Sequence, residues 1–364
     1  MDIGRSFSIN AETPFMVIDL NQARKNIEKF QKIAKNSNKA LRPHSKTHKI
    51  PFISRLQISE GASGICVQKV SEAEIMFEGG ISQILISNEV VDQRKCYRIA
   101  KLAARGCSII VAVDSVEGTE NLSKMASCFD LSIPVVIDVD TGMNRCGIEP
   151  EKVLEFHSYC KNFENIKVVG LMVYDGHING RTPLQRERMV ASEGQIISGI
   201  FKSLKEKDRN VTMLTVGGTP TAELWSKVEE ITEIQPGTYV FYDIHCLEMG
   251  LSTIDEISMG VVTQVMSMKE GERIVLDAGY KSVSIDQGIY PVPVNEDGVV
   301  GTVTAMSEEH TVIRNFGNNI SFGSKILLLP YHSCTTTDLW DYSWIFEGTR
   351  SPILTKIEAR GKRE

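Results

Sequence analysis

The sequence predicts an α/β protein whose larger domain is a (β/α)8 barrel, the TIM-barrel architecture, followed by an all-β domain. Short apolar runs and helix-like stretches alternate over about 210 residues, which is close to the expected size of such a barrel. No GxGxxG sequence follows the first of these runs, which counts against a dinucleotide-binding open sheet. Beyond residue 250, long helix-like stretches give way to short β-rich runs. A doubly wound open sheet remains the alternative.

The barrel prediction rests on the alternation of two kinds of segment. The runs expected to be strands are short and apolar: Ala40–His44, Gly64–Val67, Ile84–Ser87, Ser108–Val113, Pro134–Asp140, Lys167–Tyr174, Thr212–Val216 and Glu230–Gln235. The expected helices lie between them: Val70–Glu78, Asp92–Ala104, Val116–Ala126, Pro150–Asn162, Pro183–Lys207 and Thr221–Val228. Ahead of the first run, Thr13–Leu20 is expected to form a strand, and Asn21–Ala34 has the apolar spacing of a helix.

The last part of the chain has a different texture and is predicted to form a separate all-β domain. Its expected strands are separated by Gly, Asn and Asp turn residues: Ser258–Met268, Glu272–Asp277, Gly298–Met306, Thr311–Asn315 and Lys325–Pro330. The predicted boundaries are therefore residues 20–250 for the barrel and 251–364 for the β-domain. The terminal stretch Lys356–Glu364 carries charges of both signs and is expected to be a solvated tail.

Composition and charge restrict the function classes. Of the 364 residues, 42% are hydrophobic, and the net charge of -6 is spread along the chain, which argues against nucleic-acid binding. No apolar run is long enough to cross a bilayer, and Met1–Arg5 lacks the apolar core of a signal peptide. The 8 cysteines contain no CxxC pair, as expected in a reducing compartment. These observations predict a cytoplasmic protein without nucleic-acid or membrane partners.

The basic stretch Leu41–Lys49 is the first candidate for chemistry. If it continues as a strand, His44, Lys46 and His48 point to the same side. Neighbouring positive charge and burial would then both lower the pKa of the Lys46 amine, and a neutral amine is the form that attacks a carbonyl carbon. Lys46 also follows the first expected barrel strand, where TIM barrels carry their chemistry. The alternative is a solvated basic loop.

A glycine-containing turn follows the seventh expected strand. The sequence Val216–Thr221 places Gly217, Gly218 and Thr219 before an expected helix. Glycines allow the backbone to approach a bound group closely. The backbone N–H groups, together with the helix dipole, then favour binding of a phosphate group. Phosphate sites after strands seven and eight are common in TIM barrels. The alternative is an ordinary turn with a capping threonine.

Two more motifs lie at expected strand ends. The fifth strand ends in Asp138–Gly147, which contains Arg145, and the sixth ends in Gly170–His177, which contains Tyr174. A turn with a structural Asp–Arg pair is the alternative for the first motif.

An HxC motif follows an apolar strand in the expected β-domain. Ile326–Leu329 leads into His332 and Cys334, and in an extended chain these two side chains share one face. Imidazole and thiolate can therefore bind one ion, and two protein ligands with open positions suit a catalytic zinc. An HxC sequence without a metal is the alternative.

The stretch Arg42–Lys49 (RPHSKTHK) resembles the signature around the pyridoxal 5′-phosphate (PLP) lysine of the D-serine dehydratase and D-threonine aldolase family. This family is a branch of the alanine-racemase-like, fold-type III PLP enzymes, and the resemblance runs from about Thr13 to Cys334. It implies that Lys46 is the catalytic lysine that forms the Schiff base with PLP. It also implies that the N-terminal strand Phe15–Asp19 joins the β-domain, which then comprises residues 1–19 and 251–364, and that the protein is a homodimer.

The resemblance implies roles for the other motifs. Arg145 matches the arginine that approaches the phenolic oxygen of PLP in alanine racemases, and Tyr174 falls where those enzymes carry a histidine stacked on the ring. His177 is implied to lie near the ring or the phosphate, or to support them. The segment Gln235–Asp243 resembles the second phosphate-side segment of the family, with Tyr242 as the expected contact.

His332 and Cys334 match the metal pair of the family. HxC is the pattern of D-serine dehydratases, whereas D-threonine aldolases carry HxD and prefer harder, manganese-like ions; thiolate selects a softer ion. The expected metal is therefore Zn²⁺, with another divalent ion such as Mn²⁺ as the alternative. The segments Asp277–Lys281 and Glu308–His310 also resemble segments of the family. We interpret Asp277 and Lys281 as a structural ion pair.

Together these motifs predict a PLP- and metal-dependent lyase for D-β-hydroxy amino acids. The expected substrate is D-serine, with pyruvate and ammonia as products. An aldolase that cleaves D-threonine or another D-3-hydroxy amino acid to glycine and an aldehyde is the first alternative. An amino-acid racemase and a non-catalytic PLP carrier are further alternatives, although such carriers lack the second domain and the HxC motif.

Overall fold

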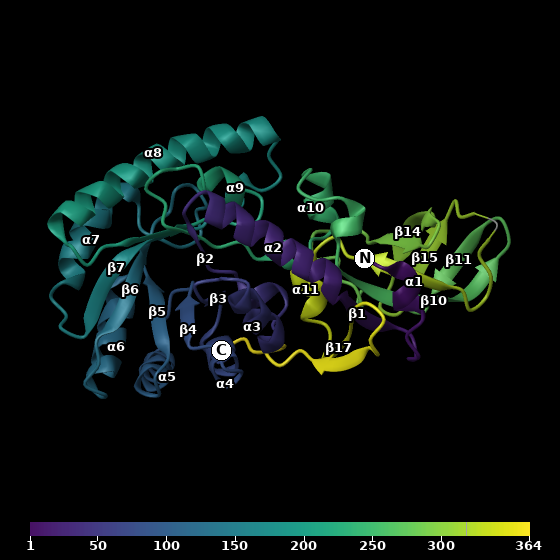
Figure 1. Cartoon of the computed structure of the whole chain (residues 1–364), viewed down its shortest axis with the longest axis horizontal. Coiled ribbons are helices and arrows are strands. Elements are labelled where there is room, and N and C mark those ends of the chain that lie inside the picture. Colours follow the sequence, from purple (N-terminus) through teal and green to yellow (C-terminus); the bar gives the residue numbers. More distant parts are fainter. Residues whose placement is uncertain (318) are drawn as a thin grey trace. The chain divides into compact units, whose positions relative to one another are not determined.

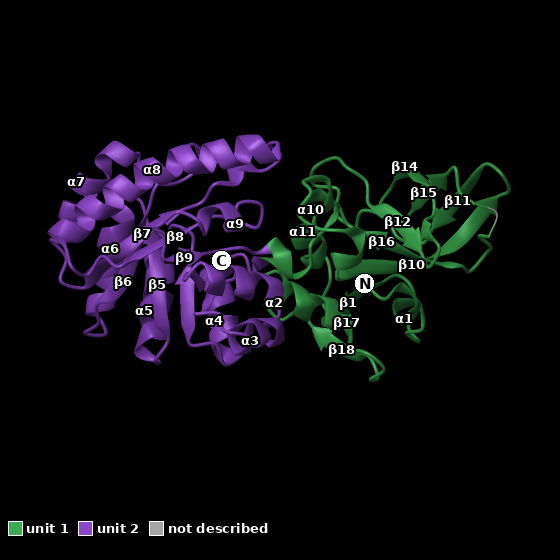
Figure 2. Cartoon of the chain, turned by 45° about the horizontal axis from the view of Figure 1, so that its top comes forward, with its two compact units in different colours: residues 1–27, 47–49, 238–361 green, residues 28–46, 50–237, 362–364 purple. Residues whose placement is uncertain are grey.

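A computed structural model of the chain describes residues 1–317 and 319–364. The chain divides into two compact units, which Figure 2 shows in different colours. Unit 1 comprises Met1–Ile27, Thr47–Lys49 and Thr238–Gly361, and unit 2 comprises Glu28–Lys46, Ile50–Gly237 and Lys362–Glu364. Helix α2 (Leu20–Asn36) and the 3₁₀ helix η1 (Ser45–Thr47) contain residues of both units.

Unit 2 contains an eight-stranded parallel sheet with the order β2-β9-β8-β7-β6-β5-β4-β3. The strands are β2 (Ala40–Leu41), β3 (Ile65–Val67), β4 (Gln83–Ile86), β5 (Ser108–Val113), β6 (Ile133–Asp138), β7 (Ile166–Val173), β8 (Met213–Val216) and β9 (Glu233–Ile234). The two ends of the sheet meet, because His44 forms a parallel bridge with Cys66, and the Cys66 N–H donates to the Pro43 carbonyl at 2.8 Å. The predicted (β/α)8 barrel architecture is confirmed.

Helices alternate with the strands of the barrel (Figure 1). They are α3 (Pro51–Ser59), α4 (Val70–Glu78), α5 (Gln93–Ala104), α6 (Val116–Ser127), α7 (Val153–Cys160), α8 (Pro183–Lys207) and α9 (Ala222–Trp225), with the 3₁₀ helices η2 (Pro150–Lys152) and η3 (Gly176–Ile178). Helix α8 begins with a proline, and the Thr182 side chain accepts the backbone N–H of Gln185 as a capping box. Val190, Ile197 and Phe201 recur at helical spacing and are buried. Capping and periodicity agree here, which is why the predicted bounds of α8 are confirmed.

The interior of the barrel combines an apolar layer with a polar network. The apolar layer contains Cys66, Leu85, Ala112, Val136 and Met172. In the network, Arg42 Nε donates to Glu233 Oε1 at 2.8 Å, and Thr215 Oγ1 donates to the same oxygen at 2.9 Å. Ser63 Oγ donates to the other carboxylate oxygen at 3.0 Å. Burial lowers the pKa of Arg42, but the charge of Glu233 outweighs burial, so the net shift of this pKa is upward.

Unit 1 is built around a ten-stranded sheet. Its main path runs β13-β12-β16-β10-β1-β17-β18, and β11, β15 and β14 continue from β10. The strands are β1 (Phe15–Asp19), β10 (Met259–Lys269), β11 (Arg273–Leu276), β12 (Val292–Asn295), β13 (Gly298–Val299), β14 (Thr302–Met306), β15 (Thr311–Arg314), β16 (Lys325–Leu329), β17 (Tyr342–Phe346) and β18 (Ile353–Lys356). The helices are α1 (Ile3–Phe7), α10 (Ile244–Glu248), α11 (Ser333–Thr337), η4 (Thr238–Val240) and η5 (Ile254–Glu256).

The N-terminal strand β1 lies in the middle of this sheet (Figure 1). It pairs antiparallel with β10, where Phe15 is opposite Val262, and parallel with β17, where Val17 is opposite Trp344. All residues of β1 are buried, as expected for a strand covered on both faces. The expectation that the N-terminal strand joins the all-β domain is confirmed.

Two features of unit 1 differ from the sequence predictions. The strands β12, β17 and β18 have no predicted counterpart, and β12 contains Pro293, which disfavours a strand in sequence reasoning. The stretch after β18 is not the expected solvated tail throughout, because Ile357 and Ala359 are buried and the Ala359 N–H donates to the Lys49 carbonyl at 3.1 Å. Two buried apolar residues among six charged ones are too few to produce a recognisable pattern.

Across the two described ranges, no helix is both long enough and apolar enough to cross a membrane. The cysteines are free thiols, and five of them are buried: Cys66, Cys96, Cys107, Cys160 and Cys246. Burial suits a small apolar side chain with a weak S–H donor.

Candidate active site

Lys46 lies in a tight turn rather than on a strand. The strand β2 ends five residues earlier, and η1 contains Lys46. The alternation that would place His44, Lys46 and His48 on one face is therefore wrong. The ring of His44 holds the turn instead, since its Nδ1 accepts the Lys46 N–H at 3.3 Å and its Nε2 lies 3.0 Å from Ser87 Oγ. Lys46 still follows the first barrel strand, as predicted from its position in the chain.

The ring of Tyr174, directly after β7, is the meeting point of three other candidate residues. Lys46 Nζ lies 5.2 Å from the ring centroid and Arg145 Cζ lies 4.9 Å from it. A Cβ atom on Gly218 would lie 3.8 Å from the ring's Cε2, so the glycine turn borders the same ring. Two cations on one aromatic ring form cation–π contacts. Unit 2 thus brings these four residues together, while their cofactor roles stay predictions.

His177 is held by a buried carboxylate on α8. Its Nε2 lies 2.9 Å from Glu193 Oε1, and Thr141 Oγ1 donates to Glu193 Oε2 at 2.6 Å. Burial raises the pKa of Glu193, although Thr141 and His177 partly oppose this shift. A Cβ atom on Gly142 would lie 3.1 Å from His177 Nε2, so the loop that carries Arg145 packs against this histidine. These contacts give His177 a supporting position between that loop and α8.

The turn after β8 has the glycine geometry that the sequence indicates, and it leads into a helix that is shorter than expected. Gly217 has a φ of 84°, in the left-handed region, and a Cβ atom there would lie 2.8 Å from Trp225 Cδ1. The Gly218 N–H donates to Thr221 Oγ1 at 3.3 Å. Helix α9 has only 4 residues, so the helix dipole behind the turn is weaker than the predicted helix Thr221–Val228 would give. A phosphate group here would depend on backbone N–H groups and on the hydroxyl of Thr219.

A buried carboxylate that sequence reasoning missed supports this turn. Asp175 is fully buried, and its Oδ2 accepts the Nε1–H of Trp225 at 2.7 Å. Burial raises the pKa of Asp175, while hydrogen bonds from Thr221 and Trp225 partly oppose the shift. Because Asp175 directly follows Tyr174, this bond ties the end of β7 to α9. The signal in the sequence is an acidic residue at the end of an apolar strand, beside a glycine.

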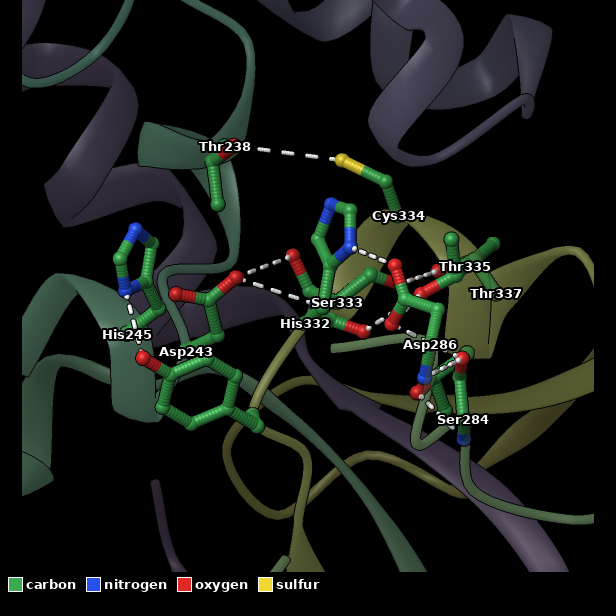
Figure 3. Close-up of polar contacts among 12 residues, drawn as sticks. Thr238, Asp243, His245, Ser284, Asp286, His332, Ser333, Cys334, Thr335 and Thr337 are labelled. Carbon is green, nitrogen blue, oxygen red and sulfur yellow. Dashed lines mark hydrogen bonds and ion pairs between the residues drawn. The ribbon is translucent and has the colours of Figure 1, made fainter. Parts of the chain in front are cut away.

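The HxC motif lies in unit 1, where β16 leads into α11. His332 is the N-cap residue of α11 and Cys334 lies in its first turn, so the expectation of an extended chain at this motif is wrong. The two side chains nevertheless converge, because Cys334 hydrogen-bonds the His332 ring. Figure 3 shows the ring extending towards the thiol. An imidazole nitrogen and a thiol sulfur on one side of a helix start form a donor set that zinc prefers.

The charge on this pair fits a cation site. Burial alone would lower the pKa of His332, but Cys334 and Asp286 outweigh burial and raise it to about 10. The imidazole therefore carries a proton between a sulfur and a carboxylate when no metal is bound. A divalent ion would replace that proton, since metal ligands must be deprotonated. The hydroxyl of Thr238 also reaches the cysteine, with Oγ1 3.9 Å from Sγ (Figure 3).

The residue between the two candidate ligands is anchored by Asp243. This buried side chain accepts the Ser333 N–H at 3.1 Å and the Ser333 hydroxyl at 3.3 Å through Oδ2 (Figure 3). Its other oxygen accepts the Cys246 N–H at 2.9 Å and caps α10. Ser333 is thus held by backbone and side chain, which explains why α11 starts there. This contact joins residues 90 positions apart, so sequence reasoning missed it.

Tyr242 lies in unit 1, two residues after the end of η4. Its φ is 50°, and its side chain is fully buried. Burial raises the pKa of its hydroxyl, which is therefore neutral at physiological pH. The expected contact between Tyr242 and a phosphate group stays a prediction.

The expected ion pair between Asp277 and Lys281 is wrong. Lys281 pairs with two other carboxylates, Glu308 at 2.8 Å and Glu309 at 3.0 Å. Asp277 accepts a hydrogen bond from the Thr263 hydroxyl at 2.5 Å. Both residues hold the strands and turns of unit 1, and neither contributes to the HxC motif.

A second cluster of metal-type donors lies in unit 2 and was missed by sequence reasoning. Glu89, Asp114 and Cys146 each place one ligand atom within 4.8 Å of the others. Burial, together with Glu89, raises the pKa of the Cys146 thiol to about 11, so the sulfur is protonated at neutral pH. Arg145 adds positive charge beside it.

Comparisons with known proteins agree with this arrangement. The alanine racemase N-terminal domain family matches residues 18–244, and a serine dehydratase domain matches residues 258–346. D-threonine aldolase from Arthrobacter sp is 33% identical over 359 residues, covering 96% of this chain and 93% of that protein. The chain belongs to the family of D-threonine aldolases and D-serine dehydratases with the alanine-racemase-like fold.

Other members of this family cover the same length. D-serine dehydratase from Dictyostelium discoideum is 25% identical over 92% of this chain and 93% of that protein. The crystal structure of D-threonine aldolase from Filomicrobium marinum has a TM-score of 0.87 and 30% identity, covering 96% of this chain and 95% of that chain. The family consists of PLP-dependent enzymes, and these relatives are lyases. The resemblance predicted from the sequence motifs is confirmed.

Proposed function

We propose that this protein is a PLP- and metal-dependent lyase for D-β-hydroxy amino acids, and that it converts D-serine to pyruvate and ammonia. The single observation that carries the dehydratase assignment is Cys334, a sulfur ligand hydrogen-bonded to His332. A thiolate in place of a carboxylate favours zinc over harder ions.

The residues around Tyr174 fit a PLP site. Lys46 is the candidate for the covalent bond, and the turn at Gly217–Thr219 supplies backbone N–H groups for the phosphate group, with Tyr242 as a further candidate contact. Arg145 keeps a fixed positive charge against the Tyr174 ring, 4.9 Å from its centroid. PLP, when bound, supplies an electron sink for negative charge at the substrate Cα.

In this proposal, Lys46 holds and moves the α-proton of the substrate. An amine that is not protonated accepts this proton as a general base. His332 and Cys334 would hold the zinc ion, which supplies Lewis acidity that makes the β-hydroxyl of the substrate a better leaving group. Loss of the α-proton and of hydroxide gives 2-aminoacrylate, and its hydrolysis gives pyruvate and ammonia.

An aldolase is the second candidate, because the relatives at 33% and 30% identity are named D-threonine aldolases. In an aldolase the β-hydroxyl loses a proton and the Cα–Cβ bond breaks, which gives glycine and an aldehyde. The residues around Tyr174 serve both reactions. The choice therefore depends on the metal ligands and on the substrate pocket.

The experiment supplies D-serine, D-threonine and L-serine to the purified protein and identifies the products. We expect pyruvate and ammonia from D-serine, formed faster than glycine and acetaldehyde from D-threonine, with L-serine unchanged. A chelator should abolish turnover while the PLP absorbance stays, and zinc should restore turnover. Glycine and acetaldehyde as dominant products would instead assign the aldolase reaction.

We also propose that the protein is a cytoplasmic homodimer. The free and mostly buried thiols support a reducing compartment. Light scattering measures the mass directly, and a value for one chain of 40.5 kDa would contradict the dimer.

A further inference from the structure

The candidate metal ligand His332 has a partner that the proposed reaction does not use. Asp286 lies in the loop between β11 and β12, and its Oδ2 is 2.8 Å from His332 Nδ1. We infer that Asp286 is a positioning residue, which turns the imidazole so that Nε2 faces the metal shared with Cys334. This inference rests on the metal site of the proposed function.

Asp286 is placed to orient a ligand rather than to be one. Its Oδ1 accepts hydroxyl hydrogen bonds from Ser284 at 3.0 Å and from Thr335 at 3.1 Å, while Oδ2 faces His332. Both oxygens are therefore occupied by donors within unit 1. Figure 3 shows this carboxylate between the imidazole ring and the two hydroxyl-bearing side chains.

The loop that carries Asp286 is fastened to the helix that carries the metal pair. The Ser284 N–H donates to Thr336 Oγ1 at 3.2 Å, and the Asp286 N–H donates to Ser284 Oγ at 3.2 Å. Together with the bond from Thr335, these contacts join the loop to α11 from two sides. A supporting shell with locked side chains keeps a ligand in its productive geometry before the metal arrives.

The chemistry of this contact decides which ring nitrogen binds the metal. A carboxylate on Nδ1 accepts the proton of that nitrogen, which leaves the lone pair on Nε2. The negative charge also makes the imidazole a stronger donor. Because Cys334 contacts the same ring, nitrogen and sulfur are presented to one ion.

The test measures zinc affinity by competition with a coloured chelator, after metal removal from the PLP-loaded protein. Asp286→Ala should weaken zinc binding by about 10- to 100-fold, as is typical for the loss of a partner of a ligating histidine. Asp286→Asn keeps an acceptor oxygen without the charge, so its zinc affinity should lie between that of Asp286→Ala and that of the natural protein. Asp341→Asn is the matched control, because Asp341 is exposed and pairs with Arg360 in the same unit.

The absorption spectrum of bound Co²⁺ gives a readout that a general loss of stability would not move. A positioning role predicts a changed cobalt spectrum in Asp286→Ala, with the unfolding midpoint of the metal-free protein unchanged. If Asp286→Ala folds poorly, Thr335→Val removes one hydroxyl bond to Asp286 and should weaken zinc binding by a smaller factor.

Two outcomes separate the failure of the inference from the failure of the proposed function. If His332→Ala loses zinc while Asp286→Ala binds zinc like the natural protein and gives the same cobalt spectrum, the positioning role is overturned and the metal site stands. If His332→Ala binds zinc as tightly as the natural protein, the metal site itself is overturned.

Discussion

The hydroxyl of Thr47 lies 3.3 Å from the Sγ atom of Cys334. Thr47 directly follows Lys46 in the chain, so one peptide bond separates the candidate PLP lysine from a residue that touches the candidate metal ligand. Both Thr47 and Cys334 belong to unit 1.

Removing this hydroxyl should weaken the metal site without removing the cofactor. Thr47→Val keeps the shape of the side chain but cannot hydrogen-bond the sulfur, and a hydrogen bond of this kind contributes about 1 kcal/mol. We therefore expect zinc binding to weaken by about fivefold, measured by chelator competition, with the PLP absorbance unchanged. Thr47→Ser keeps the hydroxyl and is the control. Equal zinc affinity in Thr47→Val and in the natural protein would show that the contact has no role in metal binding.

Lys46 should be the residue that carries PLP. Its place after the first barrel strand and its distance of 5.2 Å from the Tyr174 ring centroid motivate this prediction. Borohydride reduction followed by peptide mapping should place the cofactor on the peptide that contains Lys46. Lys46→Ala should lose turnover and the covalent label, whereas Lys39→Ala, in the same unit, should keep both. A label on any other lysine would refute the assignment.

The buried pair of Arg42 and Glu233 should be important for stability. Glu233→Gln leaves the Arg42 charge buried without a counter-charge, which costs about 3 kcal/mol in comparable pairs. Chemical denaturation should show this loss in the free energy of unfolding. The matched control is Glu149→Gln, whose exposed pair with Lys152 should change stability by less than about 0.5 kcal/mol. Equal effects of both substitutions would show that the barrel interior tolerates the unpaired arginine.

Asp175 should make stability depend on pH. Burial raises its pKa above the unfolded value, so the folded state holds this proton more tightly than the unfolded state. The stabilisation from this group is present below the unfolded pKa, near 3.8, and is lost as pH rises above that value. In Asp175→Asn the side chain does not titrate, so this loss of stability with rising pH is absent. The amide oxygen can still accept the hydrogen bond from Trp225.

The measurement is the free energy of unfolding between pH 4 and pH 7, taken at about unit intervals. The stability of Asp175→Asn relative to the natural protein should rise across this range. Asp297→Asn, at an exposed position, should follow the natural protein at every pH. Parallel curves for Asp175→Asn and the natural protein would mean that the carboxyl group titrates normally.

Local signals explain which parts of the fold were predictable. The bounds of α4 (Val70–Glu78) and α8 (Pro183–Lys207) follow from apolar periodicity and capping residues within the segments themselves. The alternation of strands and helices was equally local, and it fixed the barrel. Lys46 and the glycine turn were singled out because TIM barrels place chemistry at the carboxyl ends of their strands. Arg145 and Tyr174 were singled out because their segments resemble those of alanine racemases, and the roles of all four stay predictions.

Long-range contacts explain what the sequence could not provide. The helix start at Ser333 depends on Asp243, which lies 90 residues earlier, and no pattern near the HxC motif reveals it. The pairing of Arg42 with Glu233 joins residues 191 positions apart. Lys281 found carboxylates at Glu308 and Glu309 rather than the nearby Asp277, because tertiary contacts outweigh proximity in the chain.

The central place of β1 in the sheet of unit 1 has a consequence for biosynthesis. All strands of the barrel lie between Ala40 and Ile234, so each has its partners before β10 leaves the ribosome. The strand β1 emerges first, yet its neighbours β10 and β17 are translated after the whole barrel. A nascent chain therefore carries an apolar strand without partners through most of translation, and such a segment is a binding site for chaperones. The pairing of β1 with β17 is complete only after Phe346 has been added, so the sheet of unit 1 cannot form in full until all strands of the barrel have been translated.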